Sequence, residues 1–481
     1  MVSVPNPIRL VVLAVGLLLA RLGIIDRHRV VRTTDLAWPR IVTGIARMSK
    51  NAVDVAMVGV AIGTSAVAGV GFAGPFWGIA FAIGGGAAGG TIALVSQRYG
   101  AESFAELGDA VRAGVLLVVI ASLPVTAVFY AVPHELISLL SSNERAIAYG
   151  ADYLRIVGFG VPFAGLNLVA SRVLVGCDDA YTAMQLRAGG AAANVVLNAG
   201  FIFGLGWGVE GAALGTVVSN LAVTAAFALG IVRGRLPVLG AFPVAIDPFG
   251  SYLNREMLAD LVEIGLAVGA RNLVWVAAEF PMLFVLDIFG ETTVAAFVIS
   301  RRIWGIMNTP GWGFGLASSS LVGQALGSED PAEAEAYARD IIRFSVGTYL
   351  VSAGLIAVFT PDIVALFAES PMSPEVPIAV NLVHAACIAV VFQGVSGGAA
   401  GPLDAAGDTT IPFASQFVGM FLVAIPLAYL GATTALGLWG LYLAFLAETS
   451  IPASINYWRF RSGRWKAISE AYRPDPVAAD D

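Results

Sequence analysis

The chain has 481 residues, of which 57% are hydrophobic and only 13% charged, and its formal net charge is −7. Soluble domains carry roughly 25% charged residues, so the composition excludes an ordinary water-soluble fold. The acidic balance also argues against nucleic acid as a partner, because a nucleic-acid-binding face would be basic.

Apolar stretches long enough to cross a bilayer recur along the whole chain. A spanning helix needs about 20 predominantly apolar residues, and we predict twelve of them, at 36–62, 67–96, 110–131, 152–174, 184–205, 209–231, 258–289, 293–324, 343–360, 377–400, 411–430 and 435–457. The predicted fold class is an all-α membrane protein with twelve transmembrane helices. The predicted organisation is a cytoplasmic segment (1–35), a six-helix bundle (36–232), a cytoplasmic linker (233–257), a second six-helix bundle (258–457) and a cytoplasmic tail (458–481).

The segment 8–20 is apolar but too short for a span, which takes about 17 residues at least, and it lies between Arg9 and Arg21. A signal-peptide core is the alternative, but no small-residue cleavage pattern precedes the basic run at 27–32. We therefore predict an interfacial helix on the membrane surface.

The distribution of basic residues predicts the orientation. With both termini in the cytoplasm, nearly all arginines and lysines outside the spans lie on the inner side, and Arg145 is alone outside. This positive-inside bias supports an even number of spans in a cell membrane. Lys50 and Lys466 are the only lysines, which, with the acidic excess, hints at an archaeal or halophilic source.

The sequence contains no pattern of a metal centre or an enzyme. Cys177 and Cys387 are far apart and lack metal-ligand spacing. His-Glu-x-x-His pairs, serine elbows and paired aspartates are absent from the predicted spans. We expect neither catalysis nor a cofactor.

The chain repeats itself at a fixed offset. Leu94-Val95-Ser96-Gln97 recurs as Leu321-Val322-Gly323-Gln324, and Trp77 recurs as Trp304, each pair 227 residues apart. An offset shared by several motifs indicates two copies of one six-helix unit. An even number of spans in each copy predicts parallel repeats, with a hinge in the proline-containing link 232–257. Such halves suit alternating access, although a duplication without transport is the alternative.

Several motifs together resemble one family. They are the loops Gln97–Gly100, Gln324–Gly327 and Gly407–Thr409, and the gapless stretches Asn194–Asn198, Ile202–Gly204 and Gly211–Thr216. On these, residues 36–457 resemble the multidrug and toxic compound extrusion (MATE) exporters, in particular their DinF-like branch. The resemblance implies a V-shaped pair of bundles that acts as an antiporter, expelling small organic, often cationic, compounds while admitting Na⁺ or H⁺. Substrates and membrane lipids are then the expected partners, and a monomer is the expected state.

Asp54 is the main candidate for ion coupling. A carboxylate in the middle of a span is unfavourable by about 2.5–3.5 kcal/mol, so it needs a partner or a task, and its position resembles the membrane-embedded aspartate of the family's first helix. Lys50, one helical turn earlier on the same face, is the structural alternative as a plain ion-pair partner. Both roles hold together if Lys50 modulates the site.

Asn194 and Asn198 share one helix face, and Thr216 matches a hydroxyl position of the family. With Asp54 they form the candidate Na⁺ site; interhelical hydrogen bonding is the alternative role of the amides. The DinF-like branch has an aspartate where this chain has Asn198. An amide takes up no proton but its carbonyl coordinates a hard cation, so the sequence favours Na⁺, with H⁺ on Asp54 as the competitor.

Glu279 is the candidate for a second ion-coupling position, in the second half. It resembles a glutamate that some branches of the family use in this helix. The alternative is an ion pair with Arg271, eight residues earlier.

A flippase for lipid-linked saccharides or lipids, from the same superfamily, is the rival function. It would need a cationic cavity for phosphates, for which Arg155, Arg271, Arg301 and Arg302 are the candidates. A membrane-embedded enzyme acting on lipids is the rival from another class, and no catalytic signature supports it.

Overall fold

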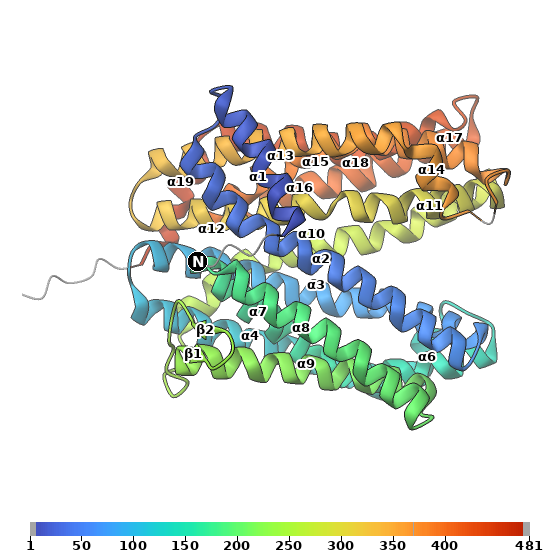
Figure 1. Ribbon diagram of the computed structural model, residues 1–481, viewed down its shortest axis with the longest axis horizontal. Helices are drawn as coiled ribbons and strands as arrows, with labels where there is room; N and C mark the ends of the chain where they lie inside the picture. The colour runs from blue at the N-terminus through green and yellow to red at the C-terminus, as the bar shows by residue number, and fades with distance from the viewer. Residues whose placement is uncertain (1–5, 369, 475–481) are drawn as a thin grey trace, which may run out of the picture. The chain divides into compact units, whose positions relative to one another are not determined.

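The computed structural model describes residues 6–368 and 370–474, and the described chain is helical apart from one short hairpin (Figure 1). The helices of the first half are α1 (Pro7–Arg21), α2 (Arg27–Ala61), α3 (Thr64–Gly100), α4 (Phe104–Ala131), α5 (Pro133–Ser138), α6 (Glu144–Val157), α7 (Val161–Gly176), α8 (Ala180–Ala199) and α9 (Gly208–Arg233). The link contains the antiparallel hairpin β1 (Arg235–Leu236) and β2 (Gly240–Ala241).

The second half repeats this order. Its helices are α10 (Arg255–Phe289), α11 (Glu291–Met307), α12 (Thr309–Gly327), α13 (Pro331–Val358), α14 (Thr360–Ala365), α15 (Glu375–Ala405), α16 (Thr410–Phe417), α17 (Ile425–Thr433), α18 (Trp439–Arg461) and α19 (Arg464–Ser469). Short 3₁₀ turns lie at Gly158–Gly160 and Glu470–Tyr472. π-helical turns lie at Gly200–Gly204, after α8, and at Val418–Ala424, between α16 and α17.

All twelve predicted spans coincide with helices. Within the described residues, nine segments are long and apolar enough to cross a membrane by length and composition. The remaining three spans correspond to α2, the consecutive pair α11–α12 and α18. Charged residues interrupt the apolar run of α2 and α18, as Lys50, Asp54 and Glu448 show. The predicted fold class is confirmed.

Turn geometry confirms the internal repeat. Gly63 (φ 116°) and Gly290 (φ 93°), 227 residues apart, both have positive φ at the start of a helix. Glu102 (φ 57°) and Glu329 (φ 59°) share the same offset and the same left-handed conformation, which is uncommon for a residue other than glycine. Two copies of one six-helix unit therefore turn at equivalent residues.

The described residues form two compact units. Unit 1 contains residues 6–41 and 271–473, and unit 2 contains residues 42–270. The divisions fall inside α2 and α10, so the first long helix of each half begins in one unit and continues into the other.

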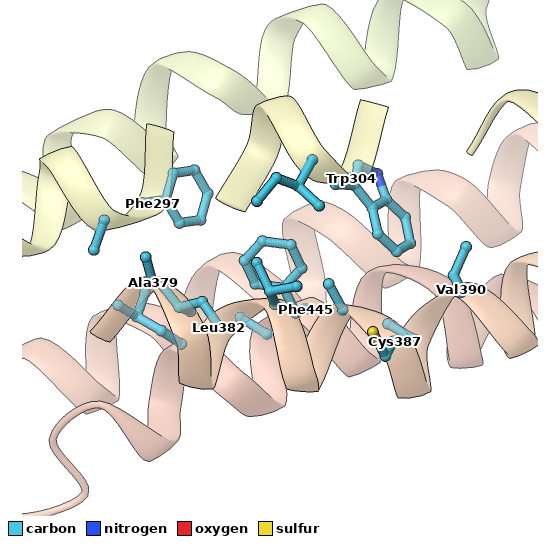
Figure 2. Close-up of a cluster of buried hydrophobic side chains, with 14 of the residues drawn as sticks. Phe297, Trp304, Ala379, Leu382, Cys387, Val390 and Phe445 are labelled. Atoms are coloured by element: carbon cyan, nitrogen blue, oxygen red, sulfur yellow. The ribbon is translucent and has the colours of Figure 1, made fainter. Parts of the chain in front are cut away.

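The core of unit 1 is an aromatic and aliphatic cluster (Figure 2). Phe297 and Trp304 on α11 pack on Phe445 of α18, with ring centroids 5.5 and 6.2 Å apart. Ala379 and Leu382 of α15 are fully buried in the same cluster. Interlocking side chains of this kind hold α11, α15 and α18 together.

The N-terminal helix α1 packs within unit 1. Gly16 lies against Phe344 of α13, and Leu19 lies against Gly347. Arg9 pairs with Asp35 at 2.8 Å. The apolar segment 8–20 is thus helical, with one side on α13.

Candidate functional site

Asp54 lies at the centre of a polar cluster in unit 2. Lys50 Nζ is 2.8 Å from Asp54 Oδ2, one helical turn earlier on α2. Asn198 Nδ2 of α8 donates to Asp54 Oδ1 at 2.8 Å. Both charged side chains are largely buried, with 18% and 14% of their surface exposed. The carboxylate is therefore held by one cation and one amide.

The amide of Asn194 can face Asp54 in two orientations. In one, its nitrogen donates to Thr216 Oγ1 at 3.2 Å and its oxygen is turned toward the carboxylate. In the other, its nitrogen donates to both carboxylate oxygens, at 3.1 and 3.3 Å, and its oxygen accepts from Thr216 and Ser219. The second satisfies more donors and acceptors while Asp54 is ionised. The first sets two oxygens against each other, so the second is the orientation that fits the site around ionised Asp54.

Local sequence explains why these side chains meet. Asn194 and Asn198 are one helical turn apart on α8 and therefore share a face. Thr216 and Ser219 lie on one side of α9, which runs beside α8 in the lower part of Figure 1. The structure thus brings together four of the predicted site residues, which are Asp54, Asn194, Asn198 and Thr216.

Two further residues join the cluster, and sequence reasoning missed both. Ser219 Oγ lies 3.3 Å from the Asn194 amide. Tyr153 of α6 lies close enough to interact with Thr216 and with the charge of Asp54. The three-residue spacing from Thr216 to Ser219 was a usable signal, whereas nothing in the sequence places Tyr153 opposite α2.

The cluster contains one oxygen with no hydrogen-bond partner. Asn198 is fully buried, and its Oδ1 accepts no hydrogen bond from the described residues. A buried carbonyl without a donor is unfavourable, and a hard cation would use its lone pairs. The nitrogen of this amide faces Asp54, so its oxygen would join Asp54, Asn194 and Thr216 as a ligand of a monovalent cation once the amide turns. In residues 6–368 and 370–474, no group of three or more His, Cys, Asp or Glu side chains suits a metal ion.

Gly215 of α9 sets the position of Asn198. A Cβ at residue 215 would overlap Asn198 Oδ1. We expect Gly215→Ala to displace this amide from Asp54 and to weaken the ion dependence of transport by about tenfold, because one well-placed charge-assisted hydrogen bond contributes about 1.5–3 kcal/mol. Transport as a function of ion concentration measures the effect. Gly200→Ala, where a Cβ meets nothing within 4 Å, is the control, and equal ion dependence of the two variants would contradict the expectation.

A group of arginines lies in the same unit. The positive charges of Arg172 on α7 and Arg47 on α2 act on Arg187 of α8, and the Arg47 guanidinium lies 5.1 Å from the Phe81 ring centroid. Arg47 precedes Asp54 by seven residues, or roughly 10 Å along α2. Unit 2 therefore has a basic group about two helical turns from Asp54.

Glu279 does not join the cluster, since it lies on α10 in unit 1. The predicted alternative of a pair with Arg271 is wrong: Arg271 donates to both oxygens of Asp404 on α15, at 3.0 and 2.7 Å. Eight residues correspond to about 12 Å along a helix, so Arg271 reaches across to α15 instead. The charged residue that acts on Glu279 is Arg301. The guanidinium of Arg301 donates to both carboxylate oxygens of Glu448, each at 2.7 Å.

The chain contains two copies of a six-helix bundle and one buried cluster of a carboxylate and amides. These features place it in the class of multi-pass membrane transporters. The sequence profile of the MatE family matches residues 39–200 and 267–430, once in each half. The chain belongs to this family.

Relatives and solved structures agree with the assignment. The chain is 27% identical to "Probable multidrug resistance protein NorM" of Bradyrhizobium diazoefficiens, over 90% of this chain and 93% of that protein. It is 25% identical to the multidrug resistance protein NorM of Vibrio cholerae serotype O1, with 87% and 92% covered. It is similar in fold to a MOP superfamily transporter from Pyrococcus furiosus, with a TM-score of 0.82, 22% identity and 91% and 96% coverage.

Proposed function

We propose that the protein is a secondary antiporter of the cell membrane that exports small organic compounds in exchange for Na⁺. Two kinds of observation support this function. Relatives that match nearly the whole chain are named multidrug resistance proteins, and Asp54 lies beside two buried amides whose oxygens can coordinate a monovalent cation once the amides turn. The positive-inside bias supports a topology with both termini in the cytoplasm.

The lack of a second carboxylate carries the choice of Na⁺ over H⁺. Asn198 Oδ1 would coordinate a cation, or accept from a protonated Asp54, once its amide turns, so this oxygen favours an occupied site with either ion. A second acidic group, which a relay of protons between carboxylates would use, is absent from the hydrogen-bonded cluster around Asp54 in the described chain. H⁺ on Asp54 alone is the competing mechanism.

Lys50 and Asn194 provide the two states that coupling requires. With Asp54 paired to Lys50, the Asn194 nitrogen faces the carboxylate; when Na⁺ binds, the amide turns its oxygen inward and Lys50 loses its partner. A lysine left unpaired in a bilayer raises the free energy of that state by a few kcal/mol, so ion occupancy shifts the balance between conformations. Export follows if the organic substrate favours the other conformation.

Efflux from vesicles under imposed gradients tests this function. We expect an imposed Na⁺ gradient to drive export of a fluorescent organic cation and an imposed pH gradient alone to drive little. Asn198→Asp is the matched variant: two carboxylates in one site raise the pKa of one of them, so export should gain pH dependence. Export that follows only the pH gradient in the parent would overturn Na⁺ coupling, and no export under either gradient would overturn the antiporter.

The flippase alternative has less support. Of the four arginines that it uses, Arg271 is paired with Asp404 and Arg301 with Glu448. Each of these two guanidiniums already forms an ion pair with a carboxylate. The cationic surface available for a lipid phosphate in these spans is correspondingly smaller.

A further inference from the structure

A cavity of about 500 Å³ lies in unit 1 where α13 and α18 meet near the turn into α19. Both α13 and α18 give it basic side chains together with aromatic or aliphatic ones. The lining residues are Glu335, Arg339, Ile342, Arg343, Tyr457, Phe460, Arg461 and Gly463. This volume lies within the range of ligand pockets, about 300–1,000 Å³.

The charges of the cavity are unbalanced. Glu335 is its one carboxylate, and both of its oxygens are occupied, by Arg339 at 2.5 Å and by Lys466 at 2.5 Å. Arg343 donates to the carbonyl oxygen of Ile24 at 2.8 Å and lies 3.8 Å from Asp340. The side chain of Arg461 makes no hydrogen bond or ion pair with any described residue. The cavity therefore offers a net positive charge with one guanidinium free to bind an anion.

The wall of the cavity is fixed by the turn that ends α18. Gly463 has a φ of 69°, a left-handed conformation that lets the chain reverse into α19. Trp465 of α19 is fully buried, stacks on Phe460 and donates from Nε1 to the carbonyl of that residue at 3.0 Å. This contact anchors α19 against α18, so Arg461 is presented by a rigid element.

The surroundings indicate a membrane boundary. Tyr457 and Trp458, in the last turn of α18, are 40% and 63% exposed. Aromatic side chains of this kind gather at the level of lipid headgroups, and basic pockets between helices at this level bind anionic headgroups. The ring of Tyr457 provides exposed apolar surface beside the arginines of the lining, as a lipid would require and a free inorganic anion would not.

We propose that this cavity binds the phosphate headgroup of an anionic membrane lipid, with Arg461 as the main contact. The phosphodiester accepts from Arg461 and from the outer faces of Arg339 and Arg343, and the acyl chains leave along α13 and α18. The site is separate from the Asp54 cluster, which lies in the other unit. We therefore expect the bound lipid to have a structural or regulatory role and not to be exported.

Native mass spectrometry of the purified full-length chain in neutral detergent tests the proposal. Phosphatidylglycerol should bind at least fivefold more tightly than phosphatidylcholine, and inorganic phosphate should not displace it at equal concentration. Arg461→Gln should weaken phosphatidylglycerol binding about fivefold, since one basic residue near a membrane surface contributes about that factor. Arg461→Lys should largely restore it.

Arg464→Gln is the matched control, because Arg464 is exposed nearby but does not line the cavity. Equal weakening by Arg461→Gln and Arg464→Gln would overturn the site in favour of general surface charge. Equal binding of the two lipids, or displacement by phosphate, would overturn the lipid assignment. The comparison of lipids uses the parent protein and so decides the question even where Arg461→Gln fails to fold.

Discussion

Asp54→Asn should reduce gradient-driven efflux to the background of vesicles without the protein, while the variant remains folded in the membrane. Among the described residues, Asp54 is the only carboxylate in the hydrogen-bonded cluster with Asn194, Asn198 and Thr216. An asparagine neither balances the charge of Na⁺ nor takes up a proton near neutral pH, so both coupling mechanisms lose their ion. Dye efflux under an imposed gradient, together with membrane abundance, measures the result.

Two further variants test whether the loss of efflux is specific to Asp54. Asp152→Asn, an exposed carboxylate on α6 in the same unit, should transport normally. Lys50→Ala should keep binding of organic cations but change the dependence on the ion, because Asp54 is no longer held by its 2.8 Å pair. Normal gradient-driven transport by Asp54→Asn would remove Asp54 from the mechanism.

The helices were predictable because the bilayer imposes a strong constraint on sequence. A span has to be apolar over about 20 residues, and nine of the described helical segments meet this condition. The spans of α2 and α18, which charged residues interrupt, were predictable from the apolar residues that flank those charges. Helix ends were less accurate: the first span was predicted from residue 36, whereas α2 begins at Arg27. Residues 27–35 are largely polar, so hydropathy does not predict that they belong to the helix. In the structure this part of α2 contacts α13, for example through the ion pair of Arg29 with Asp340 at 2.8 Å.

Contacts within one helix were also predictable, and contacts between helices were not. The spacing of four residues placed Lys50 beside Asp54 and Asn194 beside Asn198, because helix geometry alone decides which side chains share a face. The pairing of Arg271 with Asp404 joins residues 133 positions apart. It depends on the packing of α10 against α15, which a single sequence does not encode locally.

The pair of Arg301 and Glu448 in unit 1 has an almost fully buried carboxylate. Two hydrogen bonds of 2.7 Å join the guanidinium to the carboxylate, and Glu448 is only 1% exposed. The guanidinium also lies 5.0 and 4.7 Å from the ring centroids of Phe297 and Phe445. These two rings belong to the cluster of Figure 2, so the ion pair and the core that joins α11 to α18 share the same side chains.

Arg301→Leu should therefore destabilise the protein strongly. Removing one partner leaves Glu448 buried without a cation, and breaking a buried pair in this way lowers stability by about 3–5 kcal/mol. Thermal unfolding in detergent, with Arg302→Leu at the neighbouring exposed position as control, measures the loss. The double variant Arg301→Leu with Glu448→Met should recover most of it, because apolar side chains of similar volume replace buried pairs at little cost. If Arg301→Leu unfolds at the same temperature as Arg302→Leu, the ion pair does not stabilise the fold. If the double variant is no more stable than Arg301→Leu, the cation–π contacts of Arg301 with Phe297 and Phe445 contribute more to stability than its pairing with Glu448.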